Sequence, residues 1–369
     1  MFTQDQYDVL LQQNRILYVK LELLNNLEHK IDELQGNLVD GNISIDRESD
    51  VRRTCNVTFV INNNKFIPSP SSYFWFNRKF RLLIGIVNSS NNEIVWFNMG
   101  IYIVNNPVLS LSLTDKTISI EGLDKMCLYN GTLNGTLLNP VIIPVGTNIT
   151  TAIRSTLSSL GGETKFNIDL LNEVTPYTIE KNAGDTIHDI MRELADLYKD
   201  WSEIHFDING FFVFEKIRDK NSDPVSWDFS QNNILINEQN EPSFQNIKNR
   251  IQIWGHTHEE GTTTKYLMEN NDVNSPYAIN KIGYRDLFVS DDNLWNNSQA
   301  EARAIWELKE HSHLNEKIDI SSVPIYLDVN RVISFSNSGI GIFGRYLINS
   351  LNIPLNVSGS MSLKAYKLK

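Results

Sequence analysis

The sequence lacks the features of a secreted or membrane-spanning chain. Its 369 residues include two cysteines, Cys55 and Cys127, both in apolar surroundings, which favours buried free thiols over a disulfide framework. No apolar run approaches the ~18 residues that a membrane helix needs. The first residues carry an acid, Asp5, where a signal peptide would carry a base. We therefore expect assembly in the cytoplasm, without membrane insertion.

An excess of basic residues is also missing. Lys and Arg number 33 against 44 Asp and Glu, which gives a formal net charge of -11. Affinity for nucleic acid depends on clustered cations that displace counterions from phosphate. The charge balance therefore argues against a nucleic-acid-binding protein.

Signatures of catalysis and cofactor binding are absent as well. The chain contains no Gly-x-Ser-x-Gly nucleophile motif, no P-loop and no Cys-x-x-Cys pair. The acid pairs Asp291-Asp292 and Glu259-Glu260 have the residue type of a glycosidase, but that chemistry also needs a substrate cleft, which spacing alone does not reveal. We therefore expect no enzyme activity and assign no catalytic, cofactor-binding or metal-binding residue.

Several short patterns resemble ligand sites. Gly339–Gly344 has the Gly-x-Gly-x-x-Gly spacing, but it leads into another strand instead of a helix, which favours a hairpin turn. The pairs His256/His258 and His311/His313 offer two ligands each where zinc needs three or four, so surface histidines are favoured. Asp207–Gly210 begins like a calcium loop but lacks the closing Glu, and we predict a turn.

An aromatic run, Tyr73–Phe76, follows two prolines. Such a run serves either as a sugar-stacking platform or as an anchor in a core or interface. Packing in a core or interface is the favoured interpretation.

Strand patterns dominate residues 14–122. Leu82–Val87 is an unbroken apolar run and is expected to be a central strand. Ile94–Val104 follows, with a bulge expected at Gly100 and the strand end at Pro107. Leu109–Leu113 and Ile118–Ile120 then alternate apolar and polar residues, which is typical of a half-buried hairpin.

Mixed α and β patterns follow. Thr147, Asp185 and Ser298 are expected N-caps of three helices, and Thr3 of a short N-terminal helix. Residues 249–255 form a lone strand, which is not stable alone. We expect it to pair with the C-terminal strands.

The sequence thus predicts an α+β, mainly β fold with several cores, for which its 41% hydrophobic and 10% aromatic residues are ample. The expected parts are a first β-domain (1–122), an α+β domain (123–241), a discontinuous second β-domain (242–256 plus 319–369) and a small inserted domain with a helix (257–318).

This order of parts resembles the hub proteins of phage baseplates and tail tips, including the N-terminal structural module of tail-associated lysin-type proteins. The likeness spans nearly the whole chain and is carried by six segments: Gly41–Asp46, Val51–Cys55, Phe97–Ile103, Thr117–Asp124, Gly344–Ser350 and Ser358–Met361.

The resemblance implies that both β-domains have the tail-tube barrel or sandwich fold. Three subunits would then place six such domains in a ring, which adapts a sixfold tail tube to a threefold spike or tip and lines a DNA channel. The implied partners are two further copies of the chain, the tail tube or distal tail protein, and a spike, tip or lytic tail protein, with genomic DNA passing without specific binding. The implied location is the virion.

Two alternatives stay open. One is a cell-wall-active enzyme or glycan-binding tail protein, suggested by Tyr73–Phe76 and by His256 and His258. The other is the spike hub of a contractile secretion system, which shares the fold.

Overall fold

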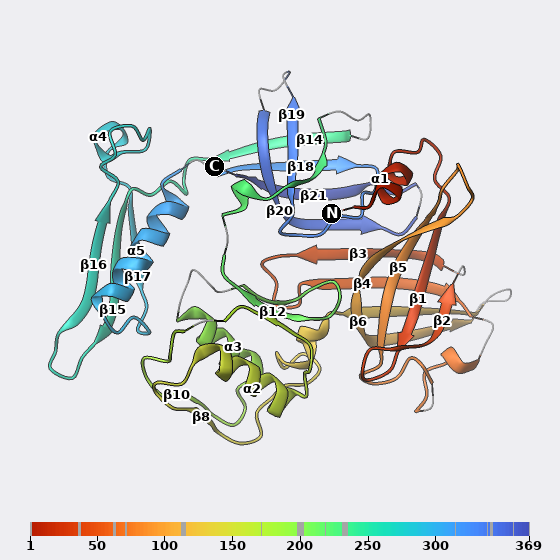
Figure 1. Cartoon of the computed structure of the whole chain (residues 1–369), viewed down its shortest axis with the longest axis horizontal. Coiled ribbons are helices and arrows are strands. Elements are labelled where there is room, and N and C mark those ends of the chain that lie inside the picture. The colour runs from red at the N-terminus through yellow and green to blue at the C-terminus, as the bar shows by residue number, and fades with distance from the viewer. Residues whose placement is uncertain are drawn as a thin grey trace.

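The computed structural model describes residues 2–35, 38–61, 64–70, 72–111, 116–170, 172–197, 203–217, 219–230, 235–313, 315–337, 339, 342–356 and 358–368. A 13-stranded sheet in two halves dominates it (Figure 1). The first half runs in the order β3-β4-β7-β6-β5-β1-β2 and the second in the order β14-β18-β21-β20, with β19 pairing β20 and β13 pairing β19. The mainly β, α+β fold expected from the sequence is therefore confirmed.

The strands of the first half lie at β1 (Leu17–Leu24), β2 (Lys30–Gln35), β3 (Leu38–Asp46), β4 (Arg53–Val60), β5 (Lys79–Val87), β6 (Ile94–Leu111) and β7 (Lys116–Leu123), with a 3-10 turn, η1 (Asn64–Phe66), between β4 and β5. Those of the second half are β13 (Val225–Asp228), β14 (Leu235–Ser243), β18 (Asn315–Ser322), β19 (Val332–Asn337), β20 (Ile342–Pro354) and β21 (Met361–Lys367).

One hydrophobic core extends over both halves of the sheet, and it is formed by the apolar residues that alternate along the strands. Leu82, Ile84 and Ile86 of β5 are buried on one face, as a strand with period two requires. Phe97 of β6 meets Tyr326 of the C-terminal part with ring centroids 4.9 Å apart. The two halves are also joined by main-chain hydrogen bonding between β3 and β20, over the register Ser350↔Asp46 to Pro354↔Asn42.

The long strand β6 confirms one expectation and corrects another. Met99 is the extra residue of a bulge opposite Leu82 and Leu83, and Gly100 beside it has φ +126°, which only glycine adopts readily. Pro107 does not end the strand. It sits at a second bulge between Asn105 and Val108, where its missing N–H removes no ladder hydrogen bond.

The α+β part lies below the large sheet in Figure 1 and has its own core. Its elements are η2 (Lys125–Leu128), β8 (Val141–Ile143), α2 (Ile149–Gly161), β9 (Phe166–Ile168), β10 (Ile179–Lys181), α3 (Ile187–Asp196), β11 (Glu203–Phe206), β12 (Phe212–Glu215) and η4 (Lys220–Ser222). Helices α2 and α3 pack together, and β12 pairs with β11 and, in parallel, with β9.

The inserted part forms a third unit at the left of Figure 1. It contains β15 (Arg250–Thr257), β16 (Thr263–Glu269), α4 (Ile279–Ile282), β17 (Asp286–Ser290) and α5 (Asn297–His311). Strand β15 is the centre of a three-stranded sheet between β16 and β17, and Ile251 and Ile253 pack under Ala300 and Ala304 of α5.

The expected pairing of residues 249–255 with the C-terminal strands is therefore wrong. The insertion supplies its own partners, because β15 pairs with the half-exposed strand β16 and with β17. The large sheet instead recruits β14, which pairs with β18, and β13, although the sequence groups both with the α+β part.

Helix starts are correct to within two residues. Thr3 caps α1 (Gln4–Leu10) in a capping box, as expected. The other N-caps are Asn148, Thr186 and Asn296, one or two residues from the expected Thr147, Asp185 and Ser298. In each of these helices the side chain of the observed N-cap accepts a hydrogen bond from a backbone amide of the first turn. Helix α1 covers the junction of the sheet halves, where Tyr7 lies 5.0 Å from Trp227 between ring centroids.

Gly122 is a packing constraint on the first half of the sheet. A Cβ built on it lies 2.7 Å from Cys55 Sγ and 2.7 Å from a Phe80 ring carbon. We expect Gly122→Ala to lower the free energy of unfolding by ~1–3 kcal/mol, because overpacking forces neighbours off their rotamers. Urea denaturation measures this. Ser119→Ala, in the same strand, is the control with an expected change under ~1 kcal/mol, and equal stability of Gly122→Ala and the wild type would contradict the packing.

Candidate functional site

A network of buried charges joins the first half of the sheet to the α+β part. Lys125 begins η2, two residues after the end of β7, and its side chain is completely buried. Its Nζ lies 2.8 Å from Glu28 Oε1 and 2.6 Å from Glu163 Oε2, and donates to the carbonyl of Gly210 at 2.8 Å. One lysine thus contacts the β1–β2 turn, the segment after α2 and the β11–β12 turn.

Glu28 is the other centre of this network. It sits in the β1–β2 turn with φ +64°, and its carboxylate also accepts from Lys79 at 2.9 Å and from Lys165 at 2.7 Å. Burial alone would raise the pKa of Glu28, but the charge and hydrogen bonds of Lys125, with those of Lys165 and Lys79, outweigh it and lower the pKa to about 2. Glu28 therefore stays ionised at neutral pH.

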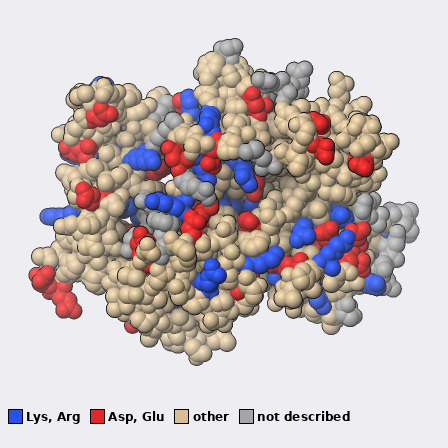
Figure 2. All heavy atoms as spheres, viewed as in Figure 1, with Lys and Arg blue, Asp and Glu red and all other residues tan. Residues whose placement is uncertain are grey.

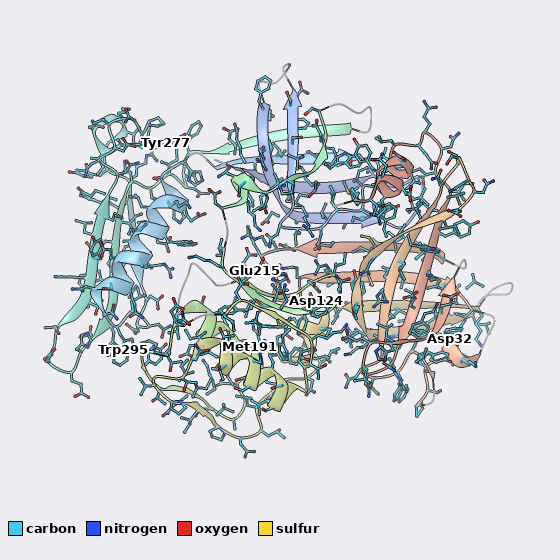
Figure 3. The ribbon with its side chains drawn as sticks, in the orientation of Figure 1. Asp32, Asp124, Met191, Glu215, Tyr277 and Trp295 are labelled. Carbon is cyan, nitrogen blue, oxygen red and sulfur yellow. The ribbon has the colours of Figure 1, made fainter. Side chains whose placement is uncertain are left out.

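A second buried network joins all three large parts. Arg53 of β4 donates to the carbonyl of Phe206 at 2.7 Å and to Asp328 of the C-terminal part at 2.6 Å. Nearby, Glu203 of β11 pairs with Arg47 and accepts from Asn330 at 2.6 Å. Figure 3 places Asp124, whose carboxylate accepts from the Arg53 amide at 2.8 Å, in the middle of the molecule.

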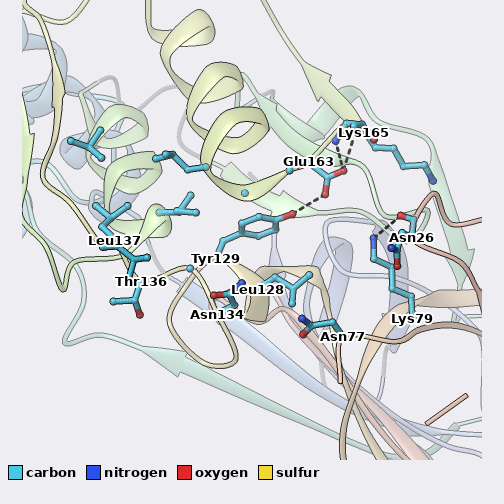
Figure 4. Close-up of a pocket in the computed structure, with 18 of the residues that line it drawn as sticks. Asn26, Asn77, Lys79, Leu128, Tyr129, Asn134, Thr136, Leu137, Glu163 and Lys165 are labelled. Carbon is cyan, nitrogen blue, oxygen red and sulfur yellow. Dashed lines mark hydrogen bonds between the residues drawn. The ribbon is translucent and has the colours of Figure 1, made fainter. Parts of the chain in front are cut away.

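A pocket of about 730 Å³ opens beside the Lys125 network (Figure 4). Its polar wall includes Lys79, Lys165 and Tyr129, and the Tyr129 hydroxyl donates to Glu163 at 3.2 Å. Each carboxylate and ammonium group here is engaged with another, and burial raises the pKa of Tyr129. The arrangement stabilises a contact between parts of the chain.

The aromatic run divides between core and surface. Phe74 is fully buried and packs on Phe66 with ring centroids 5.6 Å apart. Tyr73 leans on the same Phe66 ring, whereas Phe76 is 78% exposed. The run is therefore no flat platform, and core packing, the favoured interpretation, holds for Phe74.

The histidine pairs are not brought together into a metal centre. The His256 ring stacks on Trp295 at 3.9 Å, His258 bonds Thr264, and His311 lies 3.3 Å from Glu307. Within the described ranges, no three His, Cys, Asp or Glu side chains converge as metal ligands.

The remaining candidates are turns or paired groups. Ile342 pairs with Asn337, so β19 and β20 form the hairpin expected for the glycine-rich motif, part of which lies outside the described residues. Asp207 accepts from the amides of Asn209 and Phe211, which closes the expected turn. Asp291 pairs with Arg303 across 3.5 Å, and Glu260 accepts from Thr262. Cys55 and Cys127 are buried free thiols, and burial raises the pKa of each.

Comparison with solved structures finds the same fold over nearly the whole chain. A tail protein from Neisseria meningitidis matches with a TM-score of 0.64 and 10% identity, covering 95% of this chain and 96% of its own. The 43 kDa tail protein of prophage MuSo2 from Shewanella oneidensis matches with a TM-score of 0.62 and 13% identity, covering 95% and 98%.

The chain has the fold of phage tail proteins. The same phage tail fold extends to a type VI secretion component from Escherichia coli that is similar to bacteriophage T4 tail proteins; it matches with a TM-score of 0.53 and 10% identity, over 95% of this chain and 77% of that one. No family model matches the sequence, and no curated protein matches it. None of the helices that the structure describes is long and apolar enough to cross a membrane.

Sequence patterns did not identify the residues that hold this tail-protein fold together. Lys125, Glu28 and Arg53 belong to no motif, because each acts through partners far away in sequence. The signal available in the sequence was a pair of charged residues between apolar ones, Asp124 and Lys125 between Leu123 and Met126. Such a charge needs a buried partner.

Replacing Phe74 and Phe76 separately tests the division of the aromatic run. We expect Phe74→Ala to lower the free energy of unfolding by ~3–5 kcal/mol, because it leaves a cavity in the core. Phe76→Ala, next to it and exposed, is expected to change stability by less than ~0.5 kcal/mol. Equal effects in guanidinium denaturation would show that both rings lie in similar surroundings.

The Glu28 network predicts a pH dependence of stability. At pH 7, Glu28→Gln is expected to cost ~3–5 kcal/mol, because it leaves buried Lys125 with one carboxylate fewer. A carboxylate with a lowered folded-state pKa stabilises above its unfolded pKa of ~4.3 and loses this effect as the pH falls toward the folded value of about 2. The gap between wild type and variant should therefore narrow from pH 4.5 to pH 2.

The matched control is Glu33→Gln. Glu33 pairs with Lys30 at 2.6 Å on the surface, where an ion pair contributes ~0–1 kcal/mol. Urea denaturation at several pH values measures both variants. A Glu28→Gln cost that is as small as the control's, or one that does not change with pH, would refute the role assigned to this network.

Proposed function

We propose that this protein is a structural component of a phage tail, the hub of a baseplate or tail tip. The observation that carries the proposal is the likeness to phage tail proteins over their full length, 96% and 98% of two such chains. A partial match would fit any protein that shares one β-module. A match that covers all four parts, namely the first β, the α+β, the inserted and the C-terminal part, supports the role of a tail hub.

The proposed mechanism is symmetry matching by three copies. Each chain contributes two β-modules, one made of β1–β7 and one of β13, β14 and β18–β21, held side by side by the β3–β20 pair. Three chains then place six modules around an axis, facing a sixfold tail tube on one side and a threefold spike or tip on the other. The Arg53 network joins both modules and the α+β part, and in this proposal it keeps the modules at the fixed angle that a closed ring requires.

The ring encloses the path of the DNA in this proposal. Figure 2 shows acidic and basic side chains interspersed over the visible face. With a net charge of -11, such walls let DNA pass without sticking, since retention depends on clustered cations. The role is non-enzymatic, and the partners are the tail tube or distal tail protein and a spike, tip or lytic tail protein within the virion.

A second candidate is the spike hub of a contractile secretion system, because a type VI secretion component shares the fold. The genes adjacent to this one distinguish the two: capsid and portal genes favour a phage tail, and effector and membrane-complex genes favour a secretion system.

The oligomeric state tests the hub proposal. We expect a species of three times the chain mass of 42.3 kDa by light scattering on a sizing column, or threefold averages in images of tail particles. Pull-down from infected cells should recover tail proteins. A chain that stays monomeric at every concentration and recovers no tail protein would contradict the proposal, and clearing of cell walls in a zymogram would favour an enzyme instead.

A further inference from the structure

The inserted part has one open sheet face. In β15, Ile251 and Ile253 point toward α5, so Gln252 and Trp254 point to the opposite side. Gln252 pairs with Leu267 of β16 and with Phe288 of β17, which places these two side chains on the same outer face. We call Trp254, Leu267 and Phe288 the open face.

The open face is apolar and exposed. Trp254 is 44% exposed, Leu267 52% and Phe288 60%, and the rings of Trp254 and Phe288 lie 5.8 Å apart between centroids. Together with Tyr284 beside it, which is 62% exposed, the face presents on the order of 400 Å² of apolar surface, given ~150–250 Å² per aromatic side chain. A patch of this size is comparable to the largest apolar patch of a typical monomer, which often has a function.

The chemistry around the face fits a protein partner. Arg250 pairs with Asp286 at 2.6 Å and lies 4.0 Å from the Tyr284 ring centroid, so the border is polar and its charges are balanced. An apolar centre with aromatic residues inside a polar border is the composition of a protein interface. The rings of Trp254 and Phe288 are tilted by 54°, so they do not offer the flat surface on which a sugar stacks.

The shape of the molecule indicates where a second copy would meet this face. The inserted part, marked by Trp295, and the end of the sheet at β2, marked by Asp32, lie at opposite ends of the longest axis (Figure 3). Head-to-tail contacts between identical chains form a ring when the rotation from one chain to the next closes.

The end marked by Asp32 carries exposed apolar residues of its own. Ile61 donates to the carbonyl of Lys116, and Tyr73, which follows in the same loop, bonds Asp32. Lys116 pairs with Leu111, so the last described pair of β6 and β7 lies at this end, with Val108, Leu109 and Leu111 of β6 exposed there. Two apolar surfaces at opposite ends of one chain are what a head-to-tail contact needs.

We propose that the open face binds a second copy of this chain, at the end that carries the distal part of β6. This inference rests on the proposed hub function and names the contact that builds its ring. The open face alone supplies about half of the ~800 Å² per partner that a stable interface buries. It is the centre of the contact, where truncation costs most.

Charge substitution on the open face tests the proposal. Both Phe288→Lys and Leu267→Lys place a charge on an exposed position, so the fold is retained, and circular dichroism checks this. We expect each to weaken self-association by at least 100-fold on a sizing column with light scattering. Leu170→Lys is the control, because Leu170 is 86% exposed in the α+β part, away from this face.

The outcomes separate this inference from the hub function. If the wild type is a trimer and both variants remain trimeric, the open face is not the contact, and the hub proposal stands. If Leu170→Lys dissociates the trimer equally, the effect is not specific to the face and the inference is overturned. A wild type that never associates overturns both.

Cross-linking tests the head-to-tail geometry. Because Cys55 and Cys127 are buried, an introduced cysteine is the accessible thiol in the part of the chain that the structure describes. We expect a mixture of Phe288→Cys and Leu109→Cys proteins to be joined by a short bismaleimide linker, and neither protein to cross-link to itself. Cross-linking of Phe288→Cys alone would indicate a face-to-face contact and overturn the proposed one.

Discussion

The pairing of β3 with β20 is the interaction on which the rest of the structure depends. These strands are about 300 residues apart in sequence, and their register from Ser350↔Asp46 to Pro354↔Asn42 joins two half-sheets into one. The continuous core follows from it, because Phe97 meets Tyr326 and helix α1 meets Trp227 only when the halves are side by side. The distance between β3 and β20 in the sequence also affects folding. A contact between such distant segments forms late, because the entropic cost of closing the loop between them must first be overcome.

The buried charges serve a different purpose from the cores. Burying Lys125 or Arg53 is unfavourable unless every partner is in place, so these networks contribute less to net stability than an apolar core would. Their benefit lies in orientation. Hydrophobic surfaces can slide, whereas a lysine held by two carboxylates and a carbonyl fits one arrangement of the parts.

Sequence patterns predicted local structure well and long-range pairing poorly. The alternation of apolar and polar residues identified the strands of the first half. The bulge at Gly100 could be predicted because a glycine inside a strand often marks a bulge. The hairpin at residues 337–342 and the turn at Asp207 were correct for similar local reasons. The partner of β15 was not predictable, since an alternating strand fits any sheet with one wet face. The charge networks were missed because Glu28, Lys125 and Glu163 come together only in three dimensions.

The attachment of the inserted part has a consequence for the large sheet. Strands β14 and β18 are hydrogen-bonded neighbours, and Ser243 faces Asn315 where the chain leaves the sheet and returns to it. Everything between these two residues is therefore an excursion from one hairpin, with a core that is its own. An ordinary tight turn would close the same gap without disturbing the register of a single strand. The register of the surrounding sheet therefore does not depend on what this appendage contains.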